Sequence, residues 1–395
     1  MAAAIGNETA RAVATSHTGA VVRVETFASF SAAEHEWRAF ESPAQTATPY
    51  QSFDFLNAWQ NTVGAELGTK PLVAIAYDAD QRPVMVLPLT ARSFGPFRVA
   101  CFPGGKHANF NMPLWRRDFA ASATKSDVHA ILHHLSKREP RLDALALNQQ
   151  PFEWNGVRNP LALLRHQPPV NECPLLTIDP NADATAWIAG STRRKLNGKE
   201  RKLQALPGYR HVIARTEAEV NRLLDAFFAI KPLRMAEQKL PNVFAEPGTE
   251  QFIRQACLAG LSEGKPAIEI HGIECDAEVI AMFAGVGDTH RFSTMFNTYT
   301  MSDNARQSPG LVLLRNIIDH RIGLGYSSFD CGIGTDEYKQ HFCKERQPLF
   351  DSYLPLTAKG HLAAAVLSGT TQIKRSIKQS PTAMKWLQSY RQRFG

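Results

Sequence analysis

Hydrophobic residues in the second half of the chain recur with two spacings, one typical of helices and one typical of strands. Between 217 and 230, the apolar residues Val220, Leu223, Leu224 and Phe227 fall on one face of a helix. Short runs rich in β-branched and aromatic residues follow, and these favour strands. The predicted order is strand 209–215, helix 217–230, helix 249–262, strands 267–273, 278–286 and 291–300, helix 311–321, strand 326–330, helix 335–343 and strand 349–354.

The first half repeats this order in rougher form. Its predicted elements are strand 21–27, helices 32–40 and 53–63, strands 71–77, 83–91 and 97–102, helix 119–136 and strand 142–147. Helices interleaved with strands in this way predict an α/β (α+β) fold, with a mixed central sheet flanked by helices. We therefore expect two similar units, at 20–180 and 190–356, followed by a helical tail at 357–395.

Size and composition agree with two globular domains. A chain of 395 residues is long for one hydrophobic core, and its 44% hydrophobic and 21% charged residues are ordinary for a folded protein. No apolar run approaches the roughly 20 residues of a membrane span, and residues 1–20 lack the pattern of a secretory signal. The six cysteines show no disulfide or zinc spacing, so we expect reduced thiols and a cytoplasmic protein.

The net charge of +7 is concentrated at the C-terminal end. No acidic residue follows Asp351, whereas seven basic residues do: Lys359, Lys374, Arg375, Lys378, Lys385, Arg391 and Arg393. A basic tail of this kind suits peripheral association with an acidic surface, such as phospholipid headgroups at the inner face of a membrane. A solvated terminal helix is the alternative.

The turn from Gln307 to Val312 is the main candidate for a binding site. It reads Gln-Ser-Pro-Gly-Leu-Val and lies between a predicted strand and a predicted helix. Backbone N–H groups at a helix N-terminus bind anions, because they lack intrahelical acceptors and lie at the positive end of the helix dipole. Ser-Pro-Gly is also a common way to begin a helix, so the turn alone allows both interpretations.

The order of elements around this turn resembles that of the GNAT acyltransferase superfamily. The superfamily signature is Gln or Arg, two residues, Gly, one residue, then Gly or Ala; Gln307 and Gly310 match it and Val312 departs from it. Two further segments, 329–334 and Tyr338-Lys339, resemble the BioF-like acetyltransferase domain of CelD-type proteins, which are associated with cellulose and exopolysaccharide synthesis. The resemblance covers about 21–356 and implies tandem GNAT-like domains.

The resemblance implies acetyl-CoA as co-substrate and no metal. Its pyrophosphate would bind at Gln307, Ser308, Gly310, Leu311 and Val312, with Val312 leaving the closeness of the backbone approach open. The corresponding loop of the first half, 103–111, lacks this pattern. We therefore expect the cofactor turn only in the second domain.

Two residues are candidates for the chemistry itself. Asp330 ends a predicted strand before a Cys-Gly-Ile-Gly loop, where it would reach a cleft as general base or would cap the loop. Tyr338 lies on the next helix, where the resemblance implies protonation of the departing CoA thiolate. A half-buried structural tyrosine is the alternative.

Residues that would hold the acceptor are expected on both halves. Lys339 would neutralise a phosphate or pair with Asp330. Arg194 belongs to a predicted basic helix that would bind an anionic acceptor or face solvent. In the first half, His107 and Asn109 would line the acceptor cleft.

The sequence thus predicts an acyl-CoA-dependent N- or O-acetyltransferase. The expected acceptor is a small molecule or lipid-linked glycan, such as a sugar or polysaccharide precursor. One alternative is an aminoacyl transferase of the FemAB type, which would bring charged tRNA to the basic helix; nucleic acid is otherwise not expected. The other is a non-catalytic scaffold in exopolysaccharide synthesis.

Overall fold

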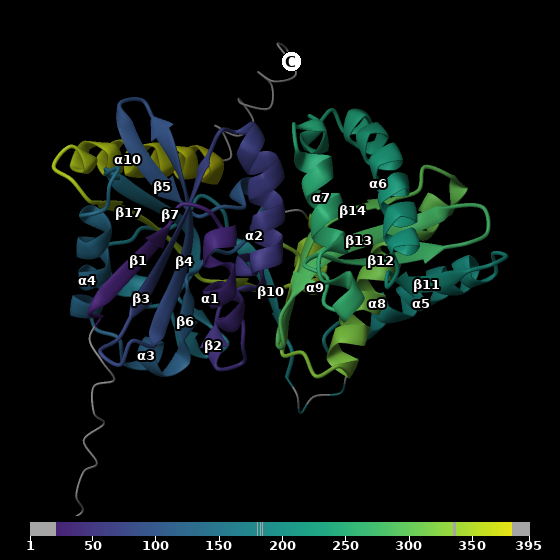
Figure 1. The fold of residues 1–395 in the computed structure, drawn as a ribbon. Coiled ribbons are helices and arrows are strands. Elements are labelled where there is room, and N and C mark those ends of the chain that lie inside the picture. Colours follow the sequence, from purple (N-terminus) through teal and green to yellow (C-terminus); the bar gives the residue numbers. More distant parts are fainter. Residues whose placement is uncertain (1–20, 180, 182, 184, 335–336, 381–395) are drawn as a thin grey trace, which may run out of the picture.

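A computed structural model describes residues 21–179, 181, 183, 185–334 and 337–380. Residues 1–20, where no secretory signal is expected, and 381–395 of the basic tail lie outside the described residues. The chain forms two sheets side by side, each with helices packed against it (Figure 1). This is the mixed α/β architecture that the sequence predicts.

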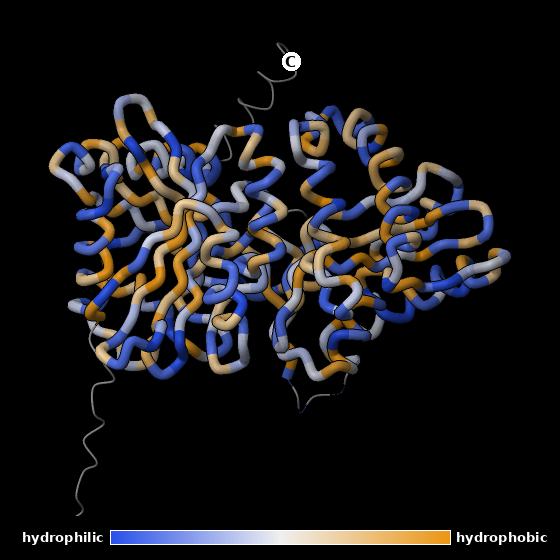
Figure 2. Tube along the Cα trace, viewed as in Figure 1, coloured by the Kyte–Doolittle hydropathy of each residue, from blue (hydrophilic) through white to orange (hydrophobic). Residues whose placement is uncertain are grey.

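The first sheet has the order β1-β3-β4-β5-β7-β17. Its strands are β1 (Arg23–Phe27), β3 (Lys70–Tyr77), β4 (Pro83–Phe94), β5 (Phe97–Cys101), β7 (Ala144–Pro151) and β17 (Leu349–Pro355); β6 (Leu114–Arg116) also pairs with β4, and β2 (Gln45–Thr46) pairs with β6. Helices of this half are α1 (Glu34–Ala39), α2 (Phe53–Trp59), α3 (Arg117–Ser122) and α4 (Lys125–Ser136), and β8 (Glu153–Trp154) and β9 (Val157–Arg158) form a small hairpin. Figure 2 shows that the central strands of this sheet are largely hydrophobic, and most residues of β3 and β4 are buried, as expected for strands covered on both faces.

The second sheet has the order β11-β12-β13-β14-β15-β10-β16. Its strands are β10 (Cys173–Thr177), β11 (Arg210–Ile213), β12 (Glu269–Glu274), β13 (Val279–Gly287), β14 (Arg291–Tyr299), β15 (Ser328–Asp330) and β16 (Glu345–Gln347). The helices of the second half are α5 (Gly190–Gln204), α6 (Glu217–Glu237), α7 (Thr249–Leu258), α8 (Pro309–Gly323) and α9 (Glu337–Phe342), with α10 (Gly360–Gln379) at the end.

The two sheets share one connectivity, which supports the predicted repeat. Each contains an antiparallel run of strands followed by one parallel pair, β5 with β7 in the first sheet and β14 with β15 in the second. A further strand then pairs antiparallel with the second member of that pair. This added strand, β17 in the first sheet and β10 in the second, comes from a distant part of the chain.

The halves exchange these last strands, which the sequence reading did not foresee. The strand at 349–354 was expected to complete the second unit, but β17 pairs with β7 of the first sheet. The strand β10, which precedes the second unit and was not predicted, pairs with β15 of the second sheet. Consequently α10 also packs on β17 and β7, and its yellow ribbon lies with the first half in Figure 1.

One predicted helix is in fact two. The apolar spacing at 119–136 is interrupted at Ala123, and α4 begins after Thr124, whose side chain accepts a hydrogen bond from the backbone N–H of Asp127. The Asp127 side chain in turn accepts from the backbone N–H of Thr124. This reciprocal capping box fixes a new helix start, so a continuous helix through 119–136 is wrong.

The two halves are joined by a shared hydrophobic core. The ring of Phe55 on α2 meets that of Phe252 on α7 at 5.2 Å between centroids, and both are fully buried. Trp154 donates from its indole nitrogen to Asp288 at 2.7 Å, and the Arg291 guanidinium lies over its ring. The contact surface between the sheets is therefore as well packed as a domain interior.

Candidate functional site

The turn singled out in the sequence forms the N-terminus of α8. A 3-10 turn, Asp303–Gln307, leads into Ser308, whose φ of 50° reverses the chain before Pro309. The Ser308 carbonyl accepts hydrogen bonds from the backbone N–H groups of Leu311 at 3.0 Å and Val312 at 3.2 Å. Among the described residues, the Gly310 N–H has no acceptor, so it remains available to an anion.

Val312, the departure from the GNAT signature, does not obstruct this turn. Its side chain is fully buried and packs into the second core with Leu313 and Ile317. A side chain at Gly310 would meet only the ring of Tyr299, at 3.6 Å from the added Cβ. Glycine at 310 therefore adds no side chain between the backbone of the turn and an approaching phosphate.

A lysine from α5 reaches the turn. The Nζ atom of Lys199 donates to Ser308 Oγ at 2.5 Å. Two ion pairs hold α5 against α8 in this position, Arg193 with Asp319 at 2.9 Å and Glu200 with Arg315 at 2.5 Å. A cation beside a helix N-terminus reinforces an anion site.

The predicted basic helix includes Lys199, but the sequence analysis selected Arg194 as its acceptor-binding residue. The Arg194 side chain is exposed on α5, and the structure does not bring it to the turn. The helical spacing of the basic residues could have separated them, because the apolar Leu196 and Leu203 mark the buried face of α5. Arg194 as an acceptor-binding residue stays a prediction.

The strands next to the turn separate from each other. β14 and β15 pair in parallel only from Arg291–Ser293 to Ser328–Asp330, whereas β14 continues along β13 as far as Tyr299. A β-bulge in the β13–β14 pairing leaves Met295 without a partner residue on β13. Bulges of this kind release backbone groups from the ladder and occur frequently beside active sites.

Asp330 is buried where these strands part; it does not reach an open cleft, and it caps the loop that follows it, which is the alternative predicted from the sequence. Its side chain is fully buried; it accepts hydrogen bonds from the Ser293 hydroxyl at 2.5 Å and from the Gly332 backbone N–H at 2.9 Å. Burial raises its pKa to about 6, although the nearby Arg291 and Lys339 act in the opposite direction. The carboxyl group therefore titrates close to neutral pH.

Residues of the first half cover this carboxylate. Asn109 Nδ2 donates to the Tyr50 hydroxyl at 2.6 Å and to the Thr294 carbonyl at 3.4 Å. Its side-chain oxygen accepts from the Ile333 N–H at 3.4 Å. Tyr50 is fully buried, and burial together with the charge of Asp330 raises its pKa. The predicted Asn109 thus reaches the site, and Tyr50 joins it without any signal in the sequence.

The other predicted residues lie around this network. Lys339 is buried and its Nζ atom donates to the carbonyl of Ile333 at 2.9 Å, so it holds the loop after Asp330. Tyr338 is half-buried against the second core. His107 packs on Phe252 at the contact between the halves, and burial lowers its pKa to about 4, so its ring is neutral at pH 7.

The described residues contain no cluster of His, Cys, Asp or Glu side chains able to hold a metal ion. All six cysteines are free thiols. Within the same residues, no helix is both long enough and apolar enough to cross a membrane.

Residues 190–340 match the family model of an acetyltransferase (GNAT) domain. None of the curated proteins matches this sequence. The matched range contains the α8 turn, the separating strands and Asp330. Its start coincides with the first residue of α5, the helix that carries Lys199.

Solved structures share the fold at low sequence identity. The structure of FemX is 8% identical, covers 86% of this chain and 100% of its own, and has a TM-score of 0.57. A conserved protein of unknown function from Bacteroides thetaiotaomicron is 12% identical, covers 85% and 100%, and has a TM-score of 0.50. Because these similarities span both halves, they support the fold of the whole chain. With the family match, they indicate an acetyltransferase (GNAT) domain at residues 190–340 and support acyl transfer as the chemistry of this region.

Proposed function

We propose that this chain transfers an acetyl group from acetyl-CoA to an amine or hydroxyl of a sugar or polysaccharide precursor. The observation that supports it most is the α8 N-terminus, where the N–H of Gly310 has no acceptor among the described residues and the ammonium of Lys199 contacts Ser308. This pair suits the pyrophosphate of a CoA thioester, which is bound as a substrate. The CelD-type resemblance of 329–334 and 338–339 supports the sugar-linked acceptor.

The proposed reaction is direct attack of the acceptor on the thioester. The new C–N or C–O bond forms as the C–S bond breaks, and the proton of the acceptor finally reaches the CoA thiolate. The backbone N–H of Met295, outside the ladder at the bulge, would stabilise the oxyanion between the separating strands. Holding both reactants beside this edge supplies most of the rate.

Proton transfer is assigned to Asp330 and Tyr338. Asp330 would act as the general base, and the hydroxyl of Ser293, which is also fully buried, donates to it. Its pKa of about 6 suits a base that works near neutral pH. Tyr338 would protonate the leaving thiolate, the role implied by the GNAT resemblance.

Calorimetric titration with CoA tests the cofactor site. We expect Lys199→Gln to weaken CoA binding about tenfold or more, because a charge-assisted hydrogen bond to phosphate is lost. Gly310→Glu should abolish it by bringing a carboxylate to the phosphate position. Arg201→Gln is the matched control, since it removes the same charge from the exposed side of the same helix.

The outcomes separate the cofactor site from the acceptor. Absence of binding at millimolar CoA in the wild-type protein would refute the proposal. Equal affinities for the Lys199 and Arg201 variants would move the pyrophosphate away from the α8 turn. Incubation with labelled acetyl-CoA and cell-envelope extracts would then identify the acceptor without depending on either variant.

A FemAB-type aminoacyl transferase is the second candidate. It is supported by the likeness to the fold of FemX over most of both chains and by the exposed basic side of α5, with Arg194, Lys195, Arg201 and Lys202. Charged tRNA and acetyl-CoA can be compared as donors in one assay. Transfer from tRNA alone, abolished by Arg194→Gln with Arg201→Gln, would favour this function.

A further inference from the structure

Helix α10 carries an apolar stripe on the side that faces away from the protein. Its inner side packs on β17 and β7 through Ala363 and Ala364. Four large apolar side chains lie on the opposite side: Leu362 is 61% exposed, Val366 41%, Ile373 62% and Ile377 39%. Spacings of four, seven and four residues keep them in line, and the stripe is about 22 Å long at ~1.5 Å per residue.

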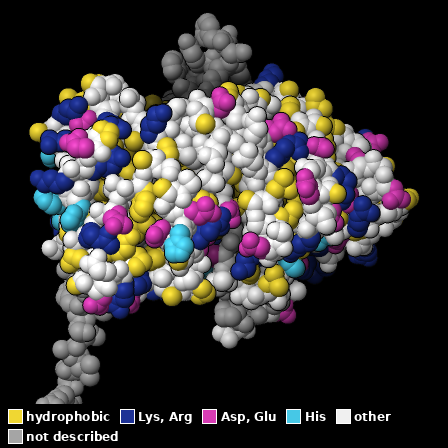
Figure 3. Space-filling model, in the orientation of Figure 1, with side chains coloured by type: hydrophobic (Ala, Val, Ile, Leu, Met, Phe, Trp, Pro, Cys, Tyr) yellow, Lys and Arg dark blue, Asp and Glu magenta, His cyan; other side chains and the backbone are white. Residues whose placement is uncertain are grey.

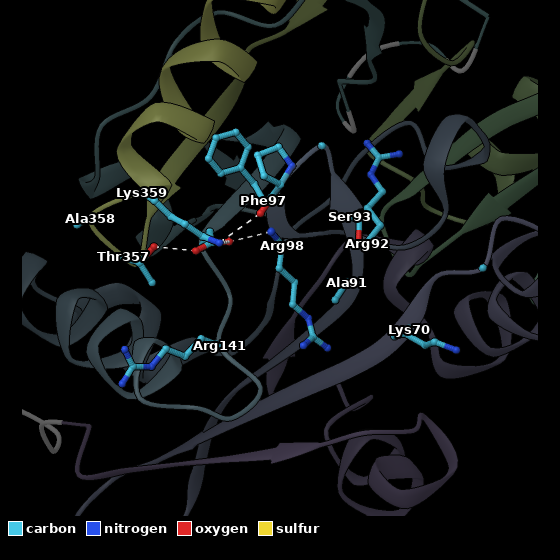
Figure 4. A pocket seen from close by; sticks show the side chains of 14 residues that line it. Lys70, Ala91, Arg92, Ser93, Phe97, Arg98, Arg141, Thr357, Ala358 and Lys359 are labelled. Carbon is cyan, nitrogen blue, oxygen red and sulfur yellow. Dashed lines mark hydrogen bonds and ion pairs between the residues drawn. The ribbon is translucent and has the colours of Figure 1, made fainter.

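A basic pocket opens at the N-terminal end of the same helix. It has a volume of about 770 Å³ and is formed by the β4–β5 turn, the start of β7 and the residues before α10. Its cationic lining residues are Lys70, Arg92, Arg98, Arg141 and Lys359. In Figure 4 the side chain of Arg98 extends into the space between Arg141 and Lys70.

The cations of the basic pocket outnumber the carboxylates that pair with them: Asp143 pairs with Lys359, and Glu139 pairs with Arg141. Asp143, the acidic residue of the lining, is buried and already accepts from the Arg98 N–H at 2.8 Å, from the Thr357 hydroxyl at 2.9 Å and from Lys359. Within the described part of the chain, Lys70, Arg92 and Arg98 have no carboxylate partner. Beside the pocket, burial and the charge of Arg98 both lower the pKa of Arg138.

The distribution of charge around the apolar stripe and the basic pocket indicates what kind of partner covers them. Lys359 and Lys374 flank the apolar stripe, and the chain after Asp351 contains no acidic residue to the end. The sequence beyond α10 is itself basic and aromatic, with Lys385, Trp386 and Arg391 among its residues. A basic segment or a second copy of this face would meet like charge, whereas an anionic surface complements it.

We propose that the apolar stripe of α10 and the basic pocket together form a docking surface for an anionic phospholipid bilayer. The stripe enters the boundary between headgroups and acyl chains, as amphipathic helices with such a side do. The pocket accepts lipid phosphates at the end of the helix. Figure 3 shows Lys and Arg side chains at this outer end of the first half, with Asp, Glu and His side chains among them. The surface lies in the first domain, separate from the α8 turn, and does not depend on the proposed acyl transfer.

Flotation of the full-length protein with vesicles tests the docking surface. We expect it to float with phosphatidylcholine vesicles that contain phosphatidylglycerol, and to remain unbound with phosphatidylcholine alone. The double variant Leu362→Glu, Ile373→Glu should lower the bound fraction at least tenfold. The double variant Arg98→Gln, Arg141→Gln should lower the affinity for the vesicles about fivefold for each charge removed. The controls are Leu324→Glu, which has a similar 58% exposure, and Lys265→Gln, both in the second half.

Each outcome decides the proposal. Binding to anionic vesicles that is reduced by both pairs of substitutions and unaffected by both controls supports it. No binding of the wild-type protein overturns it, and so does binding that survives both pairs but disappears when 381–395 are removed. If the stripe substitutions change only the size of the protein in gel filtration, the surface is a contact between copies. CoA titration of the same variants should stay unchanged, so failure here is distinct from failure of the proposed function.

Discussion

Replacing Asp330 with Asn tests whether a buried carboxyl group controls both stability and turnover. The pKa of Asp330 rises from 3.8 to about 6 because burial penalises its charged form. At ~1.4 kcal/mol per pH unit, this corresponds to about 3 kcal/mol. Asparagine keeps an acceptor for the Gly332 N–H and removes the charge, so the pH dependence should disappear while the loop stays in place.

The direction in which stability changes with pH follows from proton binding by Asp330. Between about pH 4 and pH 6 the folded protein retains a proton on Asp330 that the unfolded chain releases. The stabilisation is therefore fully present below the unfolded pKa, and is lost as the pH rises through about 6. We expect the free energy of unfolding of the wild type to fall, relative to Asp330→Asn, by about 2–3 kcal/mol from pH 4 to pH 7.5.

Urea denaturation followed by tryptophan fluorescence measures this difference at several pH values. Asp351→Asn is the matched control, because burial also raises the pKa of Asp351 to about 6, yet this residue lies on β17. Both variants should show the same change with pH, but only Asp330→Asn should reduce turnover, by about 100-fold or more. A wild-type minus Asp330→Asn difference that is constant from pH 4 to pH 7.5 would refute the reasoning about burial, and unchanged turnover would leave Asp330 a structural residue.

Two further substitutions and one truncation test other parts of the structure. Tyr338→Phe should lower turnover about 10- to 100-fold with unchanged CoA affinity by calorimetry; an equal loss of affinity would make it a binding residue. Phe252→Ala should lower the free energy of unfolding by about 3–5 kcal/mol in urea, because it empties the core that joins the two halves, and a loss below 1 kcal/mol would contradict that packing. A chain ending at Gln347 leaves β7 without β17 and should lose cooperative unfolding of the first half; normal cooperativity would show that the exchanged strand is dispensable.

Local sequence patterns predicted most of the helices and strands, because the spacing of apolar residues and the residues that begin a helix lie close together in the chain. Apolar residues at helical spacing produced α6, and alternating or continuous apolar runs produced β12, β13 and β14. The Ser-Pro-Gly sequence predicted the start of α8, since proline suits the first turn of a helix. The order of these elements was sufficient to indicate an acyltransferase fold in the second half.

Pairing partners far apart in the chain could not be predicted in this way. A strand such as β17 has the same pattern whichever sheet it joins, because side-chain alternation specifies a buried face and not a neighbour. The three-residue pairing of β15, the bulge at Met295 and the exchange of β10 and β17 all depend on which edges are free once the cores have formed.

The sequence by itself determined the kind of elements, their order and the turn that begins α8, because helix spacing, strand runs and helix-start residues are encoded at adjacent positions. Only the tertiary structure decided that Lys199, and not Arg194, reaches that turn, since the buried face of α5 selects which basic residue points to α8. It also placed Tyr50 and Asn109 over Asp330, where burial raises a carboxyl pKa that an isolated aspartate would not have. Burial and charge proximity arise from packing between distant segments, and no local pattern encodes them.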